Sequence, residues 1–165
     1  MIVLDVETSG IDPQVHGLLS IGAVDTETGE SFYADCRLSE DRTFTSIALG
    51  INGRTPESLY IGPHDVTISQ DFRAWCESRN CLVGGQQVGS FDLLFLREVF
   101  GRAGLPWPFG YRCVDLHSVA WANWGESLGL DDIQERLGLE KEPKPHNART
   151  GAKLEAECFR RLAAL

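Results

Sequence analysis

The chain has 165 residues, of which 42% are hydrophobic and 24% charged, a composition typical of a folded domain and not of a disordered chain. No apolar run approaches the roughly 18–20 residues of a membrane-spanning helix, and residues 1–7 lack the pattern of a signal peptide. The net charge of −9 argues against nonspecific binding of nucleic acid, and the five cysteines without CxxC spacing are typical of reduced thiols. We therefore expect a single cytoplasmic domain over residues 1–165, with no membrane partner.

The predicted elements follow one another without an internal repeat or a linker. An apolar, β-branched strand is predicted at 2–6, and strands at 18–25 and 30–38 extend it as an antiparallel meander. The later elements are a short helix beginning at Pro56, helices at 67–79, 91–104, 116–124, 130–139 and 147–164, and strands at 81–85 and 111–116. This order predicts an α/β fold with a mixed β-sheet flanked by helices on both faces, with functional sites at strand ends.

Asp5 and Glu7 lie two residues apart on the first predicted strand, so their side chains point to the same face. The strand is otherwise apolar, and two like charges in such a setting repel each other and are poorly solvated. A divalent cation offsets both costs, and Mg²⁺ and Mn²⁺ prefer oxygen ligands. Two interpretations stay open: a metal site, or carboxylates at an exposed strand end that cap the following turn.

Two more residues have both a structural and a functional interpretation. Asp92 lies at a strand-to-helix junction in GSFDLLFL, where the helix dipole favours an acid for purely structural reasons. His146 follows the proline-rich segment EKEPKPHNA. It is either a surface loop histidine or a mobile general base whose pKa lies near neutrality.

Several motifs, taken in chain order, resemble those of the DEDD exonucleases, in the branch that uses a catalytic histidine. They are DVETSG (5–10) followed by LLSIGAVD, INGRTPESL (51–59), SFDLLFL (90–96), VDL (114–116), LDDIQERLGL (130–139) and HNA (146–148). The resemblance implies a ribonuclease H-like fold. It also implies 3′→5′ hydrolysis of single-stranded RNA or DNA ends to nucleoside 5′-monophosphates with two Mg²⁺ or Mn²⁺ ions. Relatives such as RNase T and oligoribonuclease pair as dimers, so a homodimer is also expected.

By position, the resemblance assigns a role to each candidate acid and to the histidine. Asp5 would bridge both metal ions, and Glu7 would help hold the ion that activates water. Asp92 would support the second ion, directly or through water. His146 would take the proton from the attacking water.

The resemblance also implies where the substrate binds. Thr8 and its neighbours would lie where the terminal nucleotide sits, and Phe91, beside Asp92, is the better candidate for stacking on a base. The family often has asparagine or histidine a few residues before the second aspartate, where this chain has GGQQVGSFD. Gln86 or Gln87 would then contact a phosphate or ribose, or both are ordinary surface glutamines.

One departure from the family pattern concerns the metal site itself. The pattern places an aspartate five residues after the histidine, and here that position is Gly151, so the fourth carboxylate ligand is missing. We therefore expect an impaired exonuclease. The alternative is an inactive module on the same fold that binds nucleic-acid ends or a protein partner without cutting.

Four explanations of Gly151 stay open at this point. The chain is a weakened or inactive relative, its aspartate was replaced to block turnover, the last motif is misaligned, or another carboxylate such as Glu155 reaches the metal. Glu155 shares the helix face of Gly151, because it lies four residues further on. It also lies about 6 Å further along the helix axis, so we expect its reach to be marginal.

Overall fold

The computed structural model describes residues 1–80 and 82–165, and this part of the chain forms one mixed β-sheet in the order β3-β2-β1-β4-β5. The strands are β1 (Ile2–Thr8), β2 (Leu18–Asp25), β3 (Ser31–Asp35), β4 (Val83–Gly85) and β5 (Cys113–Asp115). The first three form the predicted antiparallel meander, whereas β4 and β5 run parallel to β1. The predicted strand at 81–85 is confirmed from Val83 on, and residue 81 lies outside the described residues.

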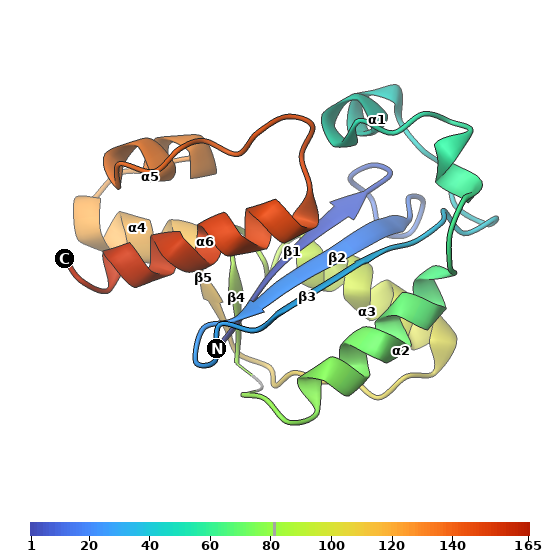
Figure 1. Ribbon diagram of the computed structural model, residues 1–165, viewed down its shortest axis with the longest axis horizontal. Helices are drawn as coiled ribbons and strands as arrows, with labels where there is room; N and C mark the ends of the chain where they lie inside the picture. The colour runs from blue at the N-terminus through green and yellow to red at the C-terminus, as the bar shows by residue number, and fades with distance from the viewer. Residues whose placement is uncertain (81) are drawn as a thin grey trace.

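Helices cover both faces of the sheet, as the sequence predicts (Figure 1). They are α1 (Ser46–Asn52), α2 (Asp65–Cys76), α3 (Asp92–Ala103), α4 (Leu116–Trp124), α5 (Leu130–Arg136) and α6 (Ala148–Leu162), with a 3₁₀ helix η1 (Ser58–Tyr60). Helices α2 and α3 pack on one face, and α6 crosses the other with α4 and α5 beside it. None of the helices described is long and apolar enough to cross a membrane.

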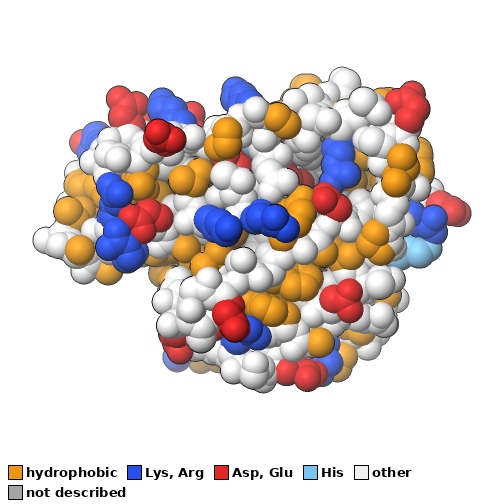
Figure 2. All heavy atoms as spheres, viewed as in Figure 1, with side chains coloured by type: hydrophobic (Ala, Val, Ile, Leu, Met, Phe, Trp, Pro, Cys, Tyr) orange, Lys and Arg blue, Asp and Glu red, His pale blue; other side chains and the backbone are white. Residues whose placement is uncertain are grey.

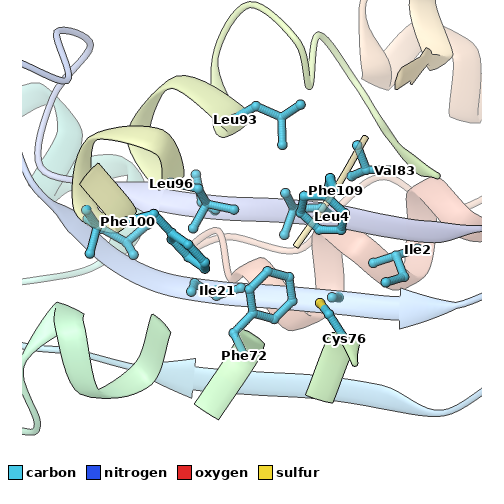
Figure 3. Close-up of a cluster of buried hydrophobic side chains, with 14 of the residues drawn as sticks. Ile2, Leu4, Ile21, Phe72, Cys76, Val83, Leu93, Leu96, Phe100 and Phe109 are labelled. Atoms are coloured by element: carbon cyan, nitrogen blue, oxygen red, sulfur yellow. The ribbon is translucent and has the colours of Figure 1, made fainter. Parts of the chain in front are cut away.

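The main apolar core fills the space between the sheet and the helices α2 and α3 (Figure 3). Ile2, Leu4 and Val6 of β1 point into it, where Phe72 of α2 and Leu96 of α3 are fully buried. Burying one such side chain stabilises a fold by about 1.5–3 kcal/mol. Because strand side chains alternate, β1 presents Asp5 and Glu7 to its opposite face.

That opposite face receives the beginning of α6 at very short range. A Cβ atom at Gly22 would lie 1.9 Å from the carbonyl oxygen of Ala148, so only glycine lets the helix come this close to β2. Gly22 pairs with Asp5 across the β1–β2 ladder. Further along, Cys158 and Leu162 of α6 join a second apolar cluster with α4 and α5. The start of α6 is thereby held next to Asp5.

The segment between β3 and α2 is where the sequence-based prediction was wrong. The helix expected to begin at Pro56 is only a 3₁₀ turn over Ser58–Tyr60, and Thr55 and Ser58 form hydrogen bonds with each other at its start. Helix α1 was not predicted, although Thr45 caps its first turn by accepting from the Ala48 N–H at 3.1 Å. The helix ends where Gly53 takes a left-handed φ of 63°.

Candidate active site

A cavity of about 520 Å³ opens on the carboxyl-end side of β1, and α1, α3, the loop before α6 and α6 itself contribute to its walls. The structure brings together here all the site residues that the sequence predicts. They are Asp5, Glu7, Thr8, Phe91, Asp92, His146 and Gly151. Three further acids, Asp131, Glu142 and Glu155, also line the cavity, so it holds more carboxylates than the family pattern implies.

Asp5 and Glu7 enter this cavity from the same face of β1, as their spacing predicts. Burial raises the pKa of Asp5 well above its ordinary value, and the charges of Glu155 and Asp92 add to the effect. Burial and the charge of Glu142 raise the pKa of Glu7 to about 8. Strand β1 therefore holds two carboxyl groups where their ionised forms are costly unless a cation accompanies them.

Asp92 joins α3 to β1 at the centre of the site. It is 4% exposed, and its Oδ1 accepts a hydrogen bond from the Val6 N–H at 3.0 Å. Burial raises the pKa of Asp92 to about 7, although backbone N–H donors act in the opposite direction. Asp92 is thus the first residue of its helix and also faces the cavity, so its two interpretations are compatible.

Helix α6 brings Gly151 and Glu155 to the other side of Asp5. A Cβ atom at Gly151 would lie 2.2 Å from Asp5 Oδ2, so the Asp5 carboxylate fills the space that a side chain there would need. Glu155 is 3% exposed, and its Oε2 accepts from the Gln86 N–H at 3.1 Å. Within the described ranges, neither Glu155 nor Asp5 forms an ion pair with a lysine, arginine or histidine.

His146 is held by an acid that the sequence analysis did not single out. Its Nδ1 lies 3.3 Å from Glu142 Oε2, and the Glu142 side chain is only 7% exposed. The other oxygen of Glu142 accepts a hydrogen bond from the backbone N–H of Asn147 at 3.1 Å. The backbone N–H of His146 donates to the Ile51 carbonyl at 3.0 Å. An acid four residues before the histidine was the available signal. With Nδ1 facing a carboxylate, Nε2 remains to act as a base.

The two glutamines also line the cavity, where Gln86 is half-buried and Gln87 is exposed. Gln87 has a left-handed φ of 53°. The side-chain oxygen of Gln86 is buried and has no hydrogen-bond donor among the described residues. The cavity wall next to Glu155 therefore holds a side-chain oxygen atom, that of Gln86, without a hydrogen-bond donor in the described part of the chain.

The chemistry of these side chains fits a divalent metal ion. The donors are buried carboxylate oxygens, which Mg²⁺ and Mn²⁺ prefer and which a cation would stabilise. As the side chains stand, no three His, Cys, Asp or Glu residues in ranges 1–80 and 82–165 are arranged to hold one ion. Asp92 and Glu155 each accept a backbone N–H, and Asp5 faces Gly151. Joint ligation therefore requires these carboxylates to turn toward a common centre.

Comparison with known sequences supports the motif-based resemblance. A family model described as RNase T exonuclease matches residues 2–159. The 3′-5′ DNA exonuclease Cap18 of Escherichia coli is 30% identical over 176 residues, which cover 99% of this chain and 91% of Cap18. A PolC-type DNA polymerase III of Thermotoga petrophila is 29% identical over 167 residues, which cover 99% of this chain but 12% of that polymerase.

Solved structures of exonuclease I share the fold. The complex of E. coli exonuclease I with a dA16 oligonucleotide has a TM-score of 0.80 at 20% identity, and covers 98% of this chain. A zinc-bound complex of the same enzyme with single-stranded DNA also has a TM-score of 0.80, at 19% identity and 98% coverage of this chain. The chain spans 40% and 39% of those two proteins. This likeness confirms the predicted ribonuclease H-like α/β fold.

Proposed function

The chain belongs to the RNase T exonuclease family, and we propose on that premise that it is a metal-dependent 3′→5′ exonuclease of single-stranded DNA or RNA. The observation that supports this best is the meeting of Asp5, Glu7, Asp92 and His146 in one cavity, although they come from three distant segments. The products would be nucleoside 5′-monophosphates. DNA is the first substrate to test, because the Cap18 name and the exonuclease I complexes both refer to DNA.

Asp5, Glu7 and Asp92 are the residues that would hold Mg²⁺ or Mn²⁺. Asp5 and Glu7 lie on β1, and helices α3 and α6 line the same cavity. The bound ions would supply Lewis-acid charge that polarises the scissile phosphate and eases deprotonation of water. His146 would accept the proton of the attacking water at Nε2. Glu142 would orient the imidazole ring and stabilise its protonated form through Nδ1.

The mouth of the cavity has the character of a nucleotide site. Ile11 and Ile47 line it and are 83% and 76% exposed, so a bound base or sugar would remove apolar surface from water. Phe91 also lines the cavity and packs against Phe95, with ring centroids 5.2 Å apart. Thr8 donates to the Gly10 carbonyl at 2.6 Å, which fixes the turn under the terminal nucleotide in this proposal.

The direct test is the digestion of 5′-labelled single-stranded DNA and RNA with Mg²⁺, Mn²⁺ or a chelator. We expect shortening from the 3′ end, release of nucleoside 5′-monophosphates and no reaction with the chelator. Asp5→Asn should lower the rate by about 10²–10³-fold, the scale of losing one preorganised electrostatic group.

Glu140→Gln is the matched control, because Glu140 is exposed and lies outside the cavity. Circular dichroism of both variants checks that each is folded. Strands that bind but stay intact with either metal would contradict the proposal and would favour the alternative of a non-cutting module.

A further inference from the structure

We propose that Glu155 supplies the fourth carboxylate of the metal site, in place of the residue that the family pattern has at Gly151. The inference rests on the proposed metal-dependent function and concerns which side chain completes the set of ligands. Both residues belong to α6, and both line the cavity with Asp5 and Asp92. The site would then keep a fourth carboxylate, but that carboxylate would come from residue 155 and not from residue 151.

The Asp5 carboxylate occupies the space beside Gly151. With a Cβ position 2.2 Å from Asp5 Oδ2, residue 151 cannot carry any side chain unless Asp5 turns away. Glycine therefore places the helix backbone directly against the Asp5 carboxylate. The close approach of Ala148 to Gly22 brings this turn of α6 down onto the sheet.

Glu155 leans back along α6 toward the turn that contains Gly151, because side chains on a helix lean toward its N-terminus. This lean, together with the extra methylene of glutamate, offsets the about 6 Å that separates the two residues along the helix axis. In the structure Glu155 lines the same cavity as Asp5, Asp92 and Gly151, and its Oε2 accepts from the Gln86 N–H at 3.1 Å. The reach of Glu155 to a bound ion, expected from the sequence to be marginal, stays a prediction.

The surroundings of Glu155 favour a positive charge next to its carboxylate. Glu155 is 3% exposed, and within the described residues its carboxylate accepts a hydrogen bond from one backbone N–H. A buried carboxylate with so little compensation is costly. An independent sign is the buried Gln86 side-chain oxygen in the same wall, which has no donor in the described part of the chain. A hard divalent cation is the ligand that such oxygen atoms favour.

The experiment is a calorimetric titration of the metal-free protein with Mn²⁺, which measures affinity and stoichiometry without any substrate. Glu155→Gln should weaken Mn²⁺ binding by at least about tenfold or remove one ion from the stoichiometry. The lower bound follows from the about 10- to 100-fold cost of losing a group that merely supports a ligand. The amide keeps the shape of the side chain and an oxygen for the Gln86 N–H, so the variant should fold.

Glu157→Gln is the matched control on the same helix. Glu157 pairs with Arg160 and Arg161 and does not line this cavity, so its substitution should leave Mn²⁺ binding unchanged.

The outcomes separate this inference from the proposed function. If the wild type binds Mn²⁺, Asp5→Asn does not, and Glu155→Gln binds as the wild type does, the assignment of Glu155 is wrong and the proposed function stands. If the wild type itself binds no Mn²⁺, the proposed function fails and the assignment fails with it.

Discussion

The two faces of strand β1 differ in almost every physical respect. Ile2, Leu4 and Val6 face an apolar core closed by α2 and α3, whereas Asp5 and Glu7 face a cavity with further acids in its walls. The first face stabilises the fold by removing apolar surface from water. The second face stores like charges in a poorly solvated space, which lowers stability until a cation is bound. The side chains of the seven residues of β1 alternate between the two faces of the sheet. The residues that stabilise the fold are thereby separated from those proposed to act in the chemistry.

Helix α6 repeats this division along its length. Its second half is anchored by Cys158 and Leu162 in the apolar cluster with α4 and α5, and its first half carries Gly151 and Glu155 to the cavity. Arg149, Lys153 and Arg160 of the same helix are exposed, and basic side chains lie on its outer surface in Figure 2. The helix therefore presents cations to solvent and carboxylate to the cavity, although the net charge of the chain is −9.

The largest effect on stability is expected from the apolar face. Leu4 is fully buried, and Leu4→Ala would leave a void between β1 and α3. We expect the free energy of unfolding to fall by about 2–5 kcal/mol, measured by urea denaturation in a chelator. Mn²⁺ affinity of the folded fraction should change little. A loss below about 1 kcal/mol would contradict the role given to this face.

The acidic face should make the metal-free protein less stable as the pH rises. Burial raises the pKa of Glu7 to about 8 and that of Asp92 to about 7. At a pH between the ordinary pKa of these groups and the raised pKa, the folded chain therefore binds more protons than the unfolded chain. The free energy of unfolding should therefore fall as the pH rises from about 5 to about 8. After allowance for solvent screening we expect a change of about 2 kcal/mol.

Urea denaturation at a series of pH values, with a chelator present, checks this slope. Glu7→Gln should flatten it, and saturating Mn²⁺ should counteract it by binding the ionised carboxylates. A stability that rises over the same pH range would mean that these carboxyl groups are better stabilised than their burial indicates.

The smallest effect is expected at the contact between Glu142 and His146. Glu142→Gln keeps the shape of the side chain but removes the charge that faces Nδ1. We expect kcat to fall about tenfold with little change in KM, because the ring loses its orientation and its charge partner. Glu140→Gln, an exposed change in the same loop, is the control. An equal fall in both variants would assign the effect to the loop as a whole.

Local patterns predicted much of the site, and three-dimensional packing supplied the rest. The spacing of Asp5 and Glu7 was enough to place both on one face, because strand side chains alternate with a period of two. The bond from Val6 to Asp92 joins residues 86 positions apart, and no local pattern encodes it. The position of Glu155 depends on how closely α6 approaches the sheet, which the sequence shows only as a glycine at 22.

Some expectations from the sequence stay predictions. The extent of the domain over residues 1–165, a homodimer and a cytoplasmic location are among them. The consequence of Gly151 for the rate also stays a prediction, and it now depends on whether Glu155 provides the missing charge. Size-exclusion chromatography at several concentrations would test the dimer.

The geometry of this cavity depends on the absence of a side chain at Gly22 of β2. An added methyl group there would meet the backbone of α6, with only 1.9 Å to the Ala148 carbonyl oxygen, and would lift the helix off the sheet. Gly151 and Glu155 would move away from Asp5 together, because both belong to helix α6. In a scan of single substitutions, position 22 would consequently score like a member of the catalytic machinery while never touching the nucleic acid.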